Sequence, residues 1–464
     1  MTLTEHHRKS GAPAVRKGFS FWKVLIYTVL SFATMIIVAA VVLVVFTDSI
    51  VNTYFNGTIT QSLEKAFPAY VFRIGTVHCG IWENRIECAS IHVEAKDSTM
   101  RCAVTGLSIG GVGWLHLLLG NGSVSSALGR ATIKSDTIVV MFPVSQYELR
   151  VERLNVSVPD SQIAVEGFTL HPSGDDEDFF AISDFRRTRF RINVPRIRLM
   201  GLACLDLLQG QRYSASAVQI RDVFLDVLIN KEKPSAKDTL SPPMPNEILL
   251  SLNTFLKIDS VMIENGNLRY GERFALGAKA AIITFDGMRV VARGITNQRA
   301  PGNMLVIESN GIFMNTGAMN LRMAIPLASP EFSLQCDGST GRMDLRSINS
   351  FIEISDHMRI TAGVLQESTF KINVASGHAG GAVRAVYNGL TLAALSKRTG
   401  SANGLSDRLV SFIANTFKIR QTNKPDKSGS LTIGKVNYQR KHDDPFFGFT
   451  WFALRSGLKD LVGF

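Results

Sequence analysis

The sequence has 464 residues, with 50 lysines and arginines against 39 aspartates and glutamates, so the formal net charge is +11. At 45% hydrophobic and 19% charged residues it is neither disordered nor fibrous, and its length suits two or three domains. The mean hydropathy of +0.12 is high for a cytosolic globular protein, yet only one stretch near the start is continuously apolar, which excludes a transporter with many spans. We therefore expect one membrane anchor followed by a long exported body.

The first 46 residues combine a basic tail with an apolar segment. No residue from Val24 to Phe46 is charged, and at 1.5 Å per residue a helix of this length spans a hydrocarbon core of about 30 Å. A cleaved signal peptide is the alternative, but its apolar part is usually about 7–15 residues and ends at a small-residue cleavage site. Residues 1–23 carry five basic residues and one acidic residue. The positive-inside rule therefore predicts a cytoplasmic tail over 1–23, a transmembrane helix over 24–46 and export of residues 47–464.

The exported body is only mildly basic. After Lys23 it has 45 basic (50 − 5) and 38 acidic (39 − 1) residues, a balance of +7. No block of lysine or arginine stands out, so we expect no nucleic-acid partner. A weak attraction to anionic lipid head groups is compatible with this charge.

The cysteines number five and are spread widely, a pattern that fits neither a disulfide scaffold nor a zinc site. Between Cys79 and Cys88 we expect a hairpin with a two-residue turn at Glu83-Asn84. That turn places the two cysteines opposite each other as a non-hydrogen-bonded pair, where side chains lie closest. An oxidising compartment permits a disulfide there, and two buried free thiols are the alternative.

Strands dominate the body. Apolar and polar residues alternate with a period of two in many short segments, which is typical of strands with one apolar face. The phase slips at Gly167 and between Val194 and Ile197, where we expect β-bulges that bend the sheet. The clearest alternating sets are Tyr147, Leu149 and Val151; Phe190, Ile192 and Val194; Val223, Leu225 and Val227; Met288, Val290 and Ala292; Leu321, Met323, Ile325 and Leu327; and Phe370, Ile372 and Val374.

Helices are few, and prolines divide the body in two. Residues 231–246 contain four prolines and indicate a linker between a β-rich repeat region over 47–230 and a C-terminal β domain over 247–440, with an amphipathic segment over 441–464. The acidic run 175–178 lies in a segment that we interpret as a solvated loop. Helices are expected within 61–67, 114–119, 246–256, 405–417 and 446–464.

An internal repeat links two parts of the N-terminal region. The segment 107–120, LSIGGVGWLHLLLG, aligns with 197–210, IRLMGLACLDLLQG, at a constant offset of 90. Gly111 aligns with Gly201, and several leucines coincide. Each unit predicts a strand, a short amphipathic helix that ends at a glycine, and further strands.

A wider resemblance rests on this organisation. One N-terminal anchor precedes units of strand, Leu-Leu-x-Gly and strand, and later come IENGNLRY (263–270), GRMDLRSIN (341–349), GAVRAVYNGL (381–390) and SGLKDL (456–461). In these features, over most of residues 20–464, the sequence resembles the AsmA-like proteins of bacterial envelopes. The resemblance implies a long, curled, mostly antiparallel β-sheet with an apolar inner groove. It also implies an inner-membrane anchor, a body in the periplasm, and a part in phospholipid transport between membranes or in outer-membrane biogenesis.

The small number of helices gives a physical reason to consider a groove. A strand buries its apolar face only against a second layer, so the sheet either closes as a sandwich or keeps an apolar concavity. A large exposed apolar surface marks a binding site, and acyl chains would fill it at about 0.8 kcal/mol per buried CH₂. The resemblance favours the groove over the sandwich. The residues expected to line it, each with ordinary core as the alternative, are Ile133, Leu149, Val151, Phe190, Ile192, Leu225, Val227 and Val290.

Two segments approach enzyme motifs without their context. Residues 106–110, GLSIG, match G-x-S-x-G, but Ser108 lies in strand-like alternation rather than at the start of a helix. Residues 429–436 approach a P-loop but have Val436 where a hydroxyl is needed. We therefore expect no catalytic residue, no cofactor and no metal.

Two functions are consistent with this sequence. In the first, the anchored body holds or conducts phospholipid along a β-groove. In the second, it is a scaffold that binds another envelope protein or a second copy of itself through a sheet edge or the C-terminal helix. The alternatives for that helix are to cap the groove or to lie on a membrane surface. Its expected membrane or partner contacts are Trp451, Phe452, Leu454, Leu458 and Leu461.

Overall fold

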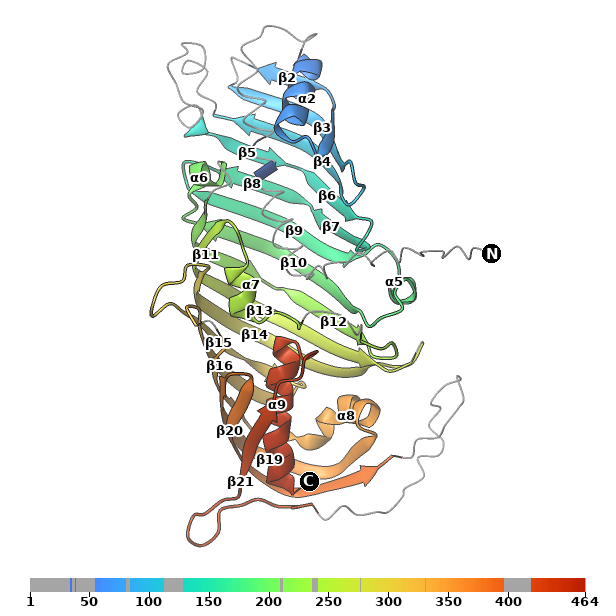
Figure 1. The fold of residues 1–464 in the computed structure, drawn as a ribbon, viewed down its shortest axis with the longest axis vertical. Coiled ribbons are helices and arrows are strands. Elements are labelled where there is room, and N and C mark those ends of the chain that lie inside the picture. The colour runs from blue at the N-terminus through green and yellow to red at the C-terminus, as the bar shows by residue number, and fades with distance from the viewer. Residues whose placement is uncertain are drawn as a thin grey trace, which may run out of the picture.

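The computed structural model describes residues 34–35, 38, 55–80, 84–111, 128–208, 212–235, 241–275, 277–329, 331–395 and 419–463. These residues form one 21-stranded sheet, with helices at its ends and edges (Figure 1), so the prediction of a mainly β protein is confirmed. Most of the expected membrane helix over 24–46, and the expected helices within 114–119 and 405–417, lie outside the described residues. Within the described ranges, no helix is both long and apolar enough to cross a membrane.

The helices agree with the expectations only in part. The expected helix within 61–67 begins earlier, and the one within 246–256 ends before β13 begins. The helix α6 is the short helix that the internal repeat predicts within 197–210, whereas α5 and α8 were not expected. The elements are α2 (Phe55–Ala66), β1 (Tyr70–Ile74), β2 (Val77–Gly80), β3 (Arg85–Ala95), β4 (Arg101–Gly110), β5 (Thr132–Ser135), β6 (Thr137–Phe142), β7 (Tyr147–Val151), β8 (Arg153–Ser157), β9 (Gln162–Pro172), α5 (Asp176–Ala181), β10 (Thr188–Met200), α6 (Cys204–Leu208), β11 (Arg212–Arg221), β12 (Phe224–Asn230), α7 (Pro245–Leu250), β13 (Phe255–Arg273), β14 (Ala281–Thr296), β15 (Met304–Phe313), β16 (Gly317–Pro326), β17 (Leu334–Thr340), β18 (Met343–Asp344), α8 (Asn349–Ser355), β19 (Met358–Ala375), β20 (His378–Ala394), β21 (Ile433–Gln439) and α9 (Phe446–Val462), with a 3-10 turn over Leu345–Ile348.

The sheet is mixed rather than wholly antiparallel. Strands follow one another in antiparallel order from the N-terminal edge, where β1 and β2 both pair with β3. The exception is β13, which pairs in parallel with β11 and β12. A parallel step needs a crossover of about a dozen residues or more, and the proline-containing residues 231–254 provide it. The expected linker is therefore a connection within one continuous sheet.

A line of backbone kinks crosses the N-terminal and central strands. Asp136 lies between β5 and β6, and Glu152 lies between β7 and β8. Neighbouring strands are in close contact along this line. The side chains of Asp136 and Glu152 lie so close to Gly106 and Gly167, respectively, that a Cβ on either glycine would collide with them. Further along, Asn265 donates a 2.7 Å hydrogen bond to Asp222. Left-handed φ angles occur along it, at Gly106 (+61°), Gly167 (+64°), Asp222 (+56°), Asn265 (+56°) and Gly287 (+57°).

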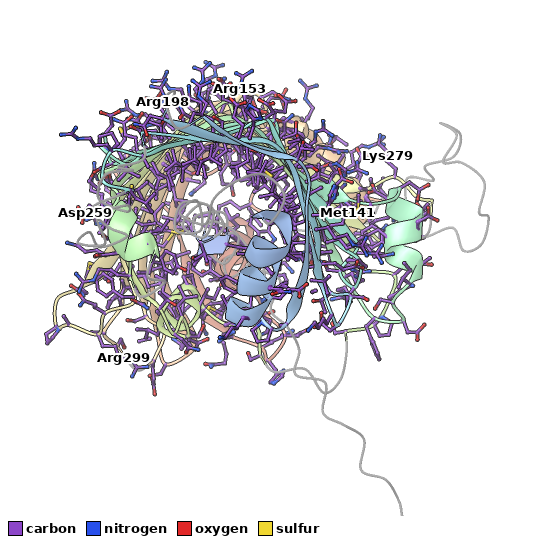
Figure 2. All side chains as sticks on the ribbon, turned by 90° about the horizontal axis from the view of Figure 1, so that it is seen from above. Met141, Arg153, Arg198, Asp259, Lys279 and Arg299 are labelled. Atoms are coloured by element: carbon purple, nitrogen blue, oxygen red, sulfur yellow. The ribbon has the colours of Figure 1, made fainter. Side chains whose placement is uncertain are left out.

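These kinks are the physical cause of the phase slips in the sequence. Pairing between β9 and β10 passes from Val194–Phe168 to Arg196–Glu166 without a change of register, and only Gly167 and Pro195, which lie opposite each other, are left out of the ladder. Because neither strand gains a residue there, the interruption is a kink at the left-handed φ of Gly167 rather than a β-bulge. Figure 2 shows the resulting curvature of the sheet around an interior.

The two faces of the curved sheet differ in chemistry. We call the face that carries the buried apolar side chains the inner face and the opposite face the outer face. Arg153 and Arg198 point outward in Figure 2. The inner side chains form two core clusters, one on the N-terminal strands and one on the C-terminal strands with α9.

Candidate functional site

Strand register aligns apolar side chains into rows across the inner face. Residues directly opposite one another on neighbouring strands share a face and contact each other. The first apolar row continues from β1 to β15 with no polar side chain apart from one cysteine thiol. Its members, each paired with the next, are Phe72, Val93, Cys102, Val140, Leu149, Leu170, Ile192, Leu225, Leu268, Phe285 and Phe313.

A second apolar row crosses the sheet on the other side of the kink line. It runs from β3 to β19 and also contains no polar side chain apart from one cysteine thiol. Its members are Ile86, Ile109, Ile133, Val156, Ile163, Leu199, Val218, Val261, Ala292, Ile307, Met323, Cys336 and Ile372.

Burial changes along both rows. Leu149 and Leu170 in the first row are 4% and 1% exposed, whereas Ile192, Leu225 and every later member is only half-buried. The second row is buried at both ends and half-buried from Leu199 to Ile307. Between β10 and β15, the described residues therefore leave the apolar inner face partly uncovered.

The predicted lining residues all lie on the inner face, but in two environments. One group is core: Ile133, Leu149 and Val151 are 3%, 4% and 7% exposed. The other group is half-buried in the central part of the sheet and consists of Phe190, Ile192, Leu225, Val227 and Val290.

Sequence reasoning missed neighbours of that second group. Leu268, Phe285 and Phe313 continue the first row, and the rings of Phe285 and Phe313 lie 5.3 Å apart. Alternation in β13 and β14 changes phase at Asn265 and Gly287, which hid these residues from a search for unbroken alternation.

Helix α9 covers the C-terminal end of the inner face. A Cβ on Gly457 would lie 2.7 Å from the side chains of Val383 and Val436, and Val436 pairs with Gly381 next to the end of the second row. The buried stripe of α9 is Phe449, Ala453, Gly457 and Leu461. Of the predicted contact residues only Leu461 belongs to it, while Trp451, Phe452, Leu454 and Leu458 are half-buried.

Two residues of the expected membrane segment lie against the N-terminal part of the inner face. Met35 is 8% exposed and belongs to the N-terminal core cluster. The hydroxyl oxygen of Thr34 lies 2.9 Å from that of Tyr213 on β11.

The acidic run 175–178 is not the solvated loop that the sequence suggested. It forms the N-cap and first turn of α5, beside the strand ends in Figure 1. Arg189, only 1% exposed, pairs with Asp176 at 3.1 Å and with Asp226 at 2.8 Å. A buried guanidinium needs such partners because desolvation otherwise disfavours its charge.

The expected hairpin register at Cys79 and Cys88 is wrong by two residues. Gly80 pairs with Arg85, so four residues rather than two connect the strands, and Cys79 lies opposite Ile86 in the backbone ladder. Cys88 is a buried free thiol that donates to the Ser90 carbonyl at 3.3 Å. The register removes the geometric reason for a disulfide between Cys79 and Cys88.

Two groups that could carry chemistry, Ser108 and Cys336, both lie within strands. The strand that contains Ser108 continues to Gly110, so Ser108 does not begin a helix. Burial raises the pKa of the Cys336 thiol to about 12, with Asp337 contributing. Across the described ranges, no group of histidine, cysteine and carboxylate side chains could hold a metal ion.

Comparisons with known proteins add no assignment: no family model matches the sequence, and no curated protein matches it. The proposal of function therefore starts from the geometry of the inner face.

Proposed function

We propose that this chain is an inner-membrane-anchored periplasmic protein whose apolar inner face forms a groove for phospholipid acyl chains. In that role it takes part in phospholipid transport between membranes or in outer-membrane biogenesis. The observation that carries the proposal is the half-buried centre of the two apolar rows, between β10 and β15. A continuous apolar surface of this kind is unfavourable in water unless a ligand covers it.

The shape of the rows suits an extended apolar ligand. Each row runs across the strands, so neighbouring members are separated by the strand spacing of about 4.8 Å. An acyl chain laid along a row would contact one side chain per strand, and each buried CH₂ would contribute about 0.8 kcal/mol. Ile192, Leu225, Leu268 and Phe285 offer four such contacts in succession.

Photocrosslinking tests the proposal with a matched pair of phenylalanines. Benzoylphenylalanine replaces Phe285 on the inner face in one variant and Phe224, an outer residue that is 42% exposed, in the other. The full chain is irradiated in its membrane, and the product is examined by mass spectrometry. We expect a phospholipid adduct at position 285 and little at position 224. Equal yields, or no adduct at 285, contradict the groove.

An anchored scaffold without lipid transfer is the second candidate. It is favoured by Phe447 at the start of α9, whose ring touches that of Phe446 at 5.1 Å between centroids but is still 73% exposed, an unusual exposure for a large apolar side chain. Phe447→Ser leaves the buried stripe of α9 intact, so loss of a co-purifying envelope protein from this variant would support the scaffold. Unchanged recovery of partners would count against it.

A further inference from the structure

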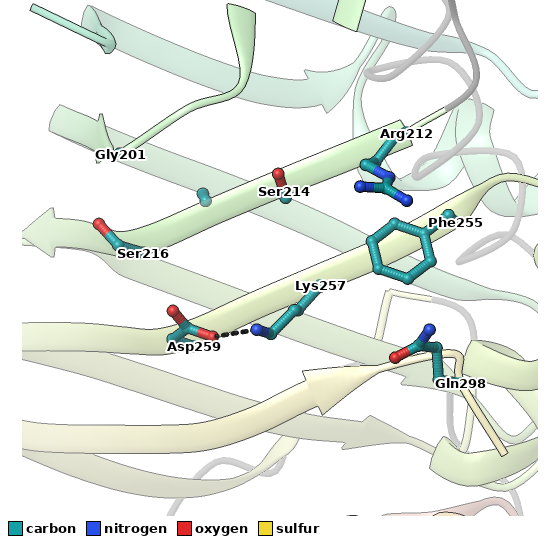
Figure 3. A pocket seen from close by; sticks show the side chains of 9 residues that line it. Gly201, Arg212, Ser214, Ser216, Phe255, Lys257, Asp259 and Gln298 are labelled. Carbon is teal, nitrogen blue, oxygen red and sulfur yellow. Dashed lines mark ion pairs between the residues drawn. The ribbon is translucent and has the colours of Figure 1, made fainter. Parts of the chain in front are cut away.

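The outer face carries a pocket that the inner-face proposal does not use. Its volume is about 460 Å³, and it lies where β11 and β13 run side by side (Figure 3). In the parallel register Arg212 lies opposite Phe255, and Ser214 lies opposite Lys257. On each strand the two residues are two positions apart, so all four side chains project from the same face of the sheet.

Two cations in the pocket are available to an anion. The Arg212 guanidinium lies over the Phe255 ring, 4.8 Å from its centroid, and no carboxylate among the described residues pairs with it. Lys257 lies 3.5 Å from Asp259, but both side chains are more than half exposed. Exposed pairs of this kind are weak, so a stronger anion can displace Asp259.

Two neutral side chains add hydrogen-bond donors beside the two cations. The Ser214 hydroxyl and the Gln298 amide line the same pocket, and neither side chain has a hydrogen-bond partner within the described part of the chain. Phe255 holds the guanidinium plane in place, which reduces the rotamer entropy lost when its donors bind.

We propose that this pocket binds a phosphate group. A guanidinium presents paired donors that match phosphate oxygens, and an ammonium adds a compact charge. Diagonal neighbours on adjacent strands are about 7–8 Å apart, so one tetrahedral anion between Arg212 and Lys257 contacts both. The remaining oxygens accept from Ser214 and Gln298. Inorganic phosphate and the phosphodiester of a lipid head group share this chemistry.

Calorimetry on the full chain in dodecyl maltoside micelles tests the site. One arm titrates inorganic phosphate, and the other titrates glycerophosphoglycerol, a soluble phosphodiester head group. We expect at least one of the two ligands to bind. The ligand that binds more tightly shows whether the site takes free phosphate or the phosphodiester of a lipid head group. Arg212→Gln should weaken it at least about tenfold, because a hydrogen bond to a charged group is lost. Asp259→Asn should strengthen it, because the competing carboxylate is removed.

The control is Arg198→Gln, which removes a charge from the same outer face without lining the pocket. It should leave binding within about twofold. The proposal is overturned if the native chain binds neither ligand at millimolar concentration, or if Arg212→Gln and Arg198→Gln behave alike. The pocket and the apolar rows lie on opposite faces, so failure here leaves the photocrosslinking result untouched.

Discussion

Gly434 of β21 and Gly457 of α9 approach so closely that no side chain fits between them. A Cβ on Gly434 would lie 2.0 Å from the Gly457 carbonyl oxygen and 2.8 Å from the Leu461 side chain. The contact lets the helix backbone rest directly on the last strand. Asp460 strengthens it by accepting a 2.7 Å hydrogen bond from the Lys435 backbone N–H. Closure of the C-terminal end of the inner face thus depends on two residues without side chains.

Gly434→Ala should destabilise the protein by about 1–3 kcal/mol, because the added methyl group forces α9 away from the sheet. The measurement is the free energy of unfolding from urea denaturation. Gly380→Ala in β20 is the matched control, since a Cβ there makes only ordinary contact at 3.7 Å. A Gly434→Ala variant as stable as Gly380→Ala would show that the helix does not rest on β21.

Gly167→Ala should also destabilise, for two separable reasons. Its φ of +64° costs a residue with a Cβ about 1–2 kcal/mol, and the new methyl group would meet Glu152 at about 2.4 Å. Glu152→Ala removes the second cost but not the first. In a double-mutant cycle, Gly167→Ala should therefore lower the free energy of unfolding less in the Glu152→Ala background than in the native chain, but still lower it. Strict additivity would mean that Glu152 does not contact this kink.

Much of the fold could be predicted, because alternation depends only on local sequence. Tyr147, Leu149 and Val151 were expected on one apolar face and are all buried. The phase slips at Gly167 and between Val194 and Ile197 are present as kinks, but the expected bulges are not, because β9 and β10 keep one register through both positions. The parallel pairing of β13 was not predictable, because it depends on where the chain returns after residues 231–254.

The centre of the candidate site was predicted less well, for a different reason. Alternation shows that Leu149 and Leu225 face inward, but it cannot show what covers them. Leu149 lies over a filled core, while Leu225 lies where the described residues leave the sheet partly uncovered. Burial against elements distant in sequence decides this difference, and a single sequence carries little information about it.

That difference predicts unequal costs for the same substitution. Leu149→Ala should reduce the free energy of unfolding by about 2–5 kcal/mol, the range for a buried leucine that leaves a cavity. Leu225→Ala should cost roughly 1 kcal/mol, because a half-buried side chain loses less transfer free energy and leaves no closed cavity. Urea denaturation compares the two. Equal losses would place Leu225 in an ordinary core.

The ion pairs under α5 should be costly to break. Asp226→Asn leaves the buried Arg189 with Asp176, at 3.1 Å, as its remaining carboxylate. Loss of the only partner of a buried charge costs about 3–5 kcal/mol, so with one partner kept the cost should lie near the lower end of that range. Glu166→Gln is the control: it breaks the exposed 2.6 Å pair with Arg153 and should cost about 0–1 kcal/mol. If both variants unfold at the same urea concentration, the buried pair contributes no more than a surface pair.

Cys336 should make stability depend on pH in the alkaline range. Burial raises its pKa from 9.0 to about 12 in the folded chain, so the folded state keeps the proton that the unfolded state releases. The contribution is complete below pH 9 and is lost as the pH rises toward 12, by up to about 1.4 kcal/mol per pH unit. Cys336→Ala removes this titration, so its free energy of unfolding should fall less steeply over that range. If the two pH profiles are parallel, Cys336 has the same pKa in the folded and the unfolded chain.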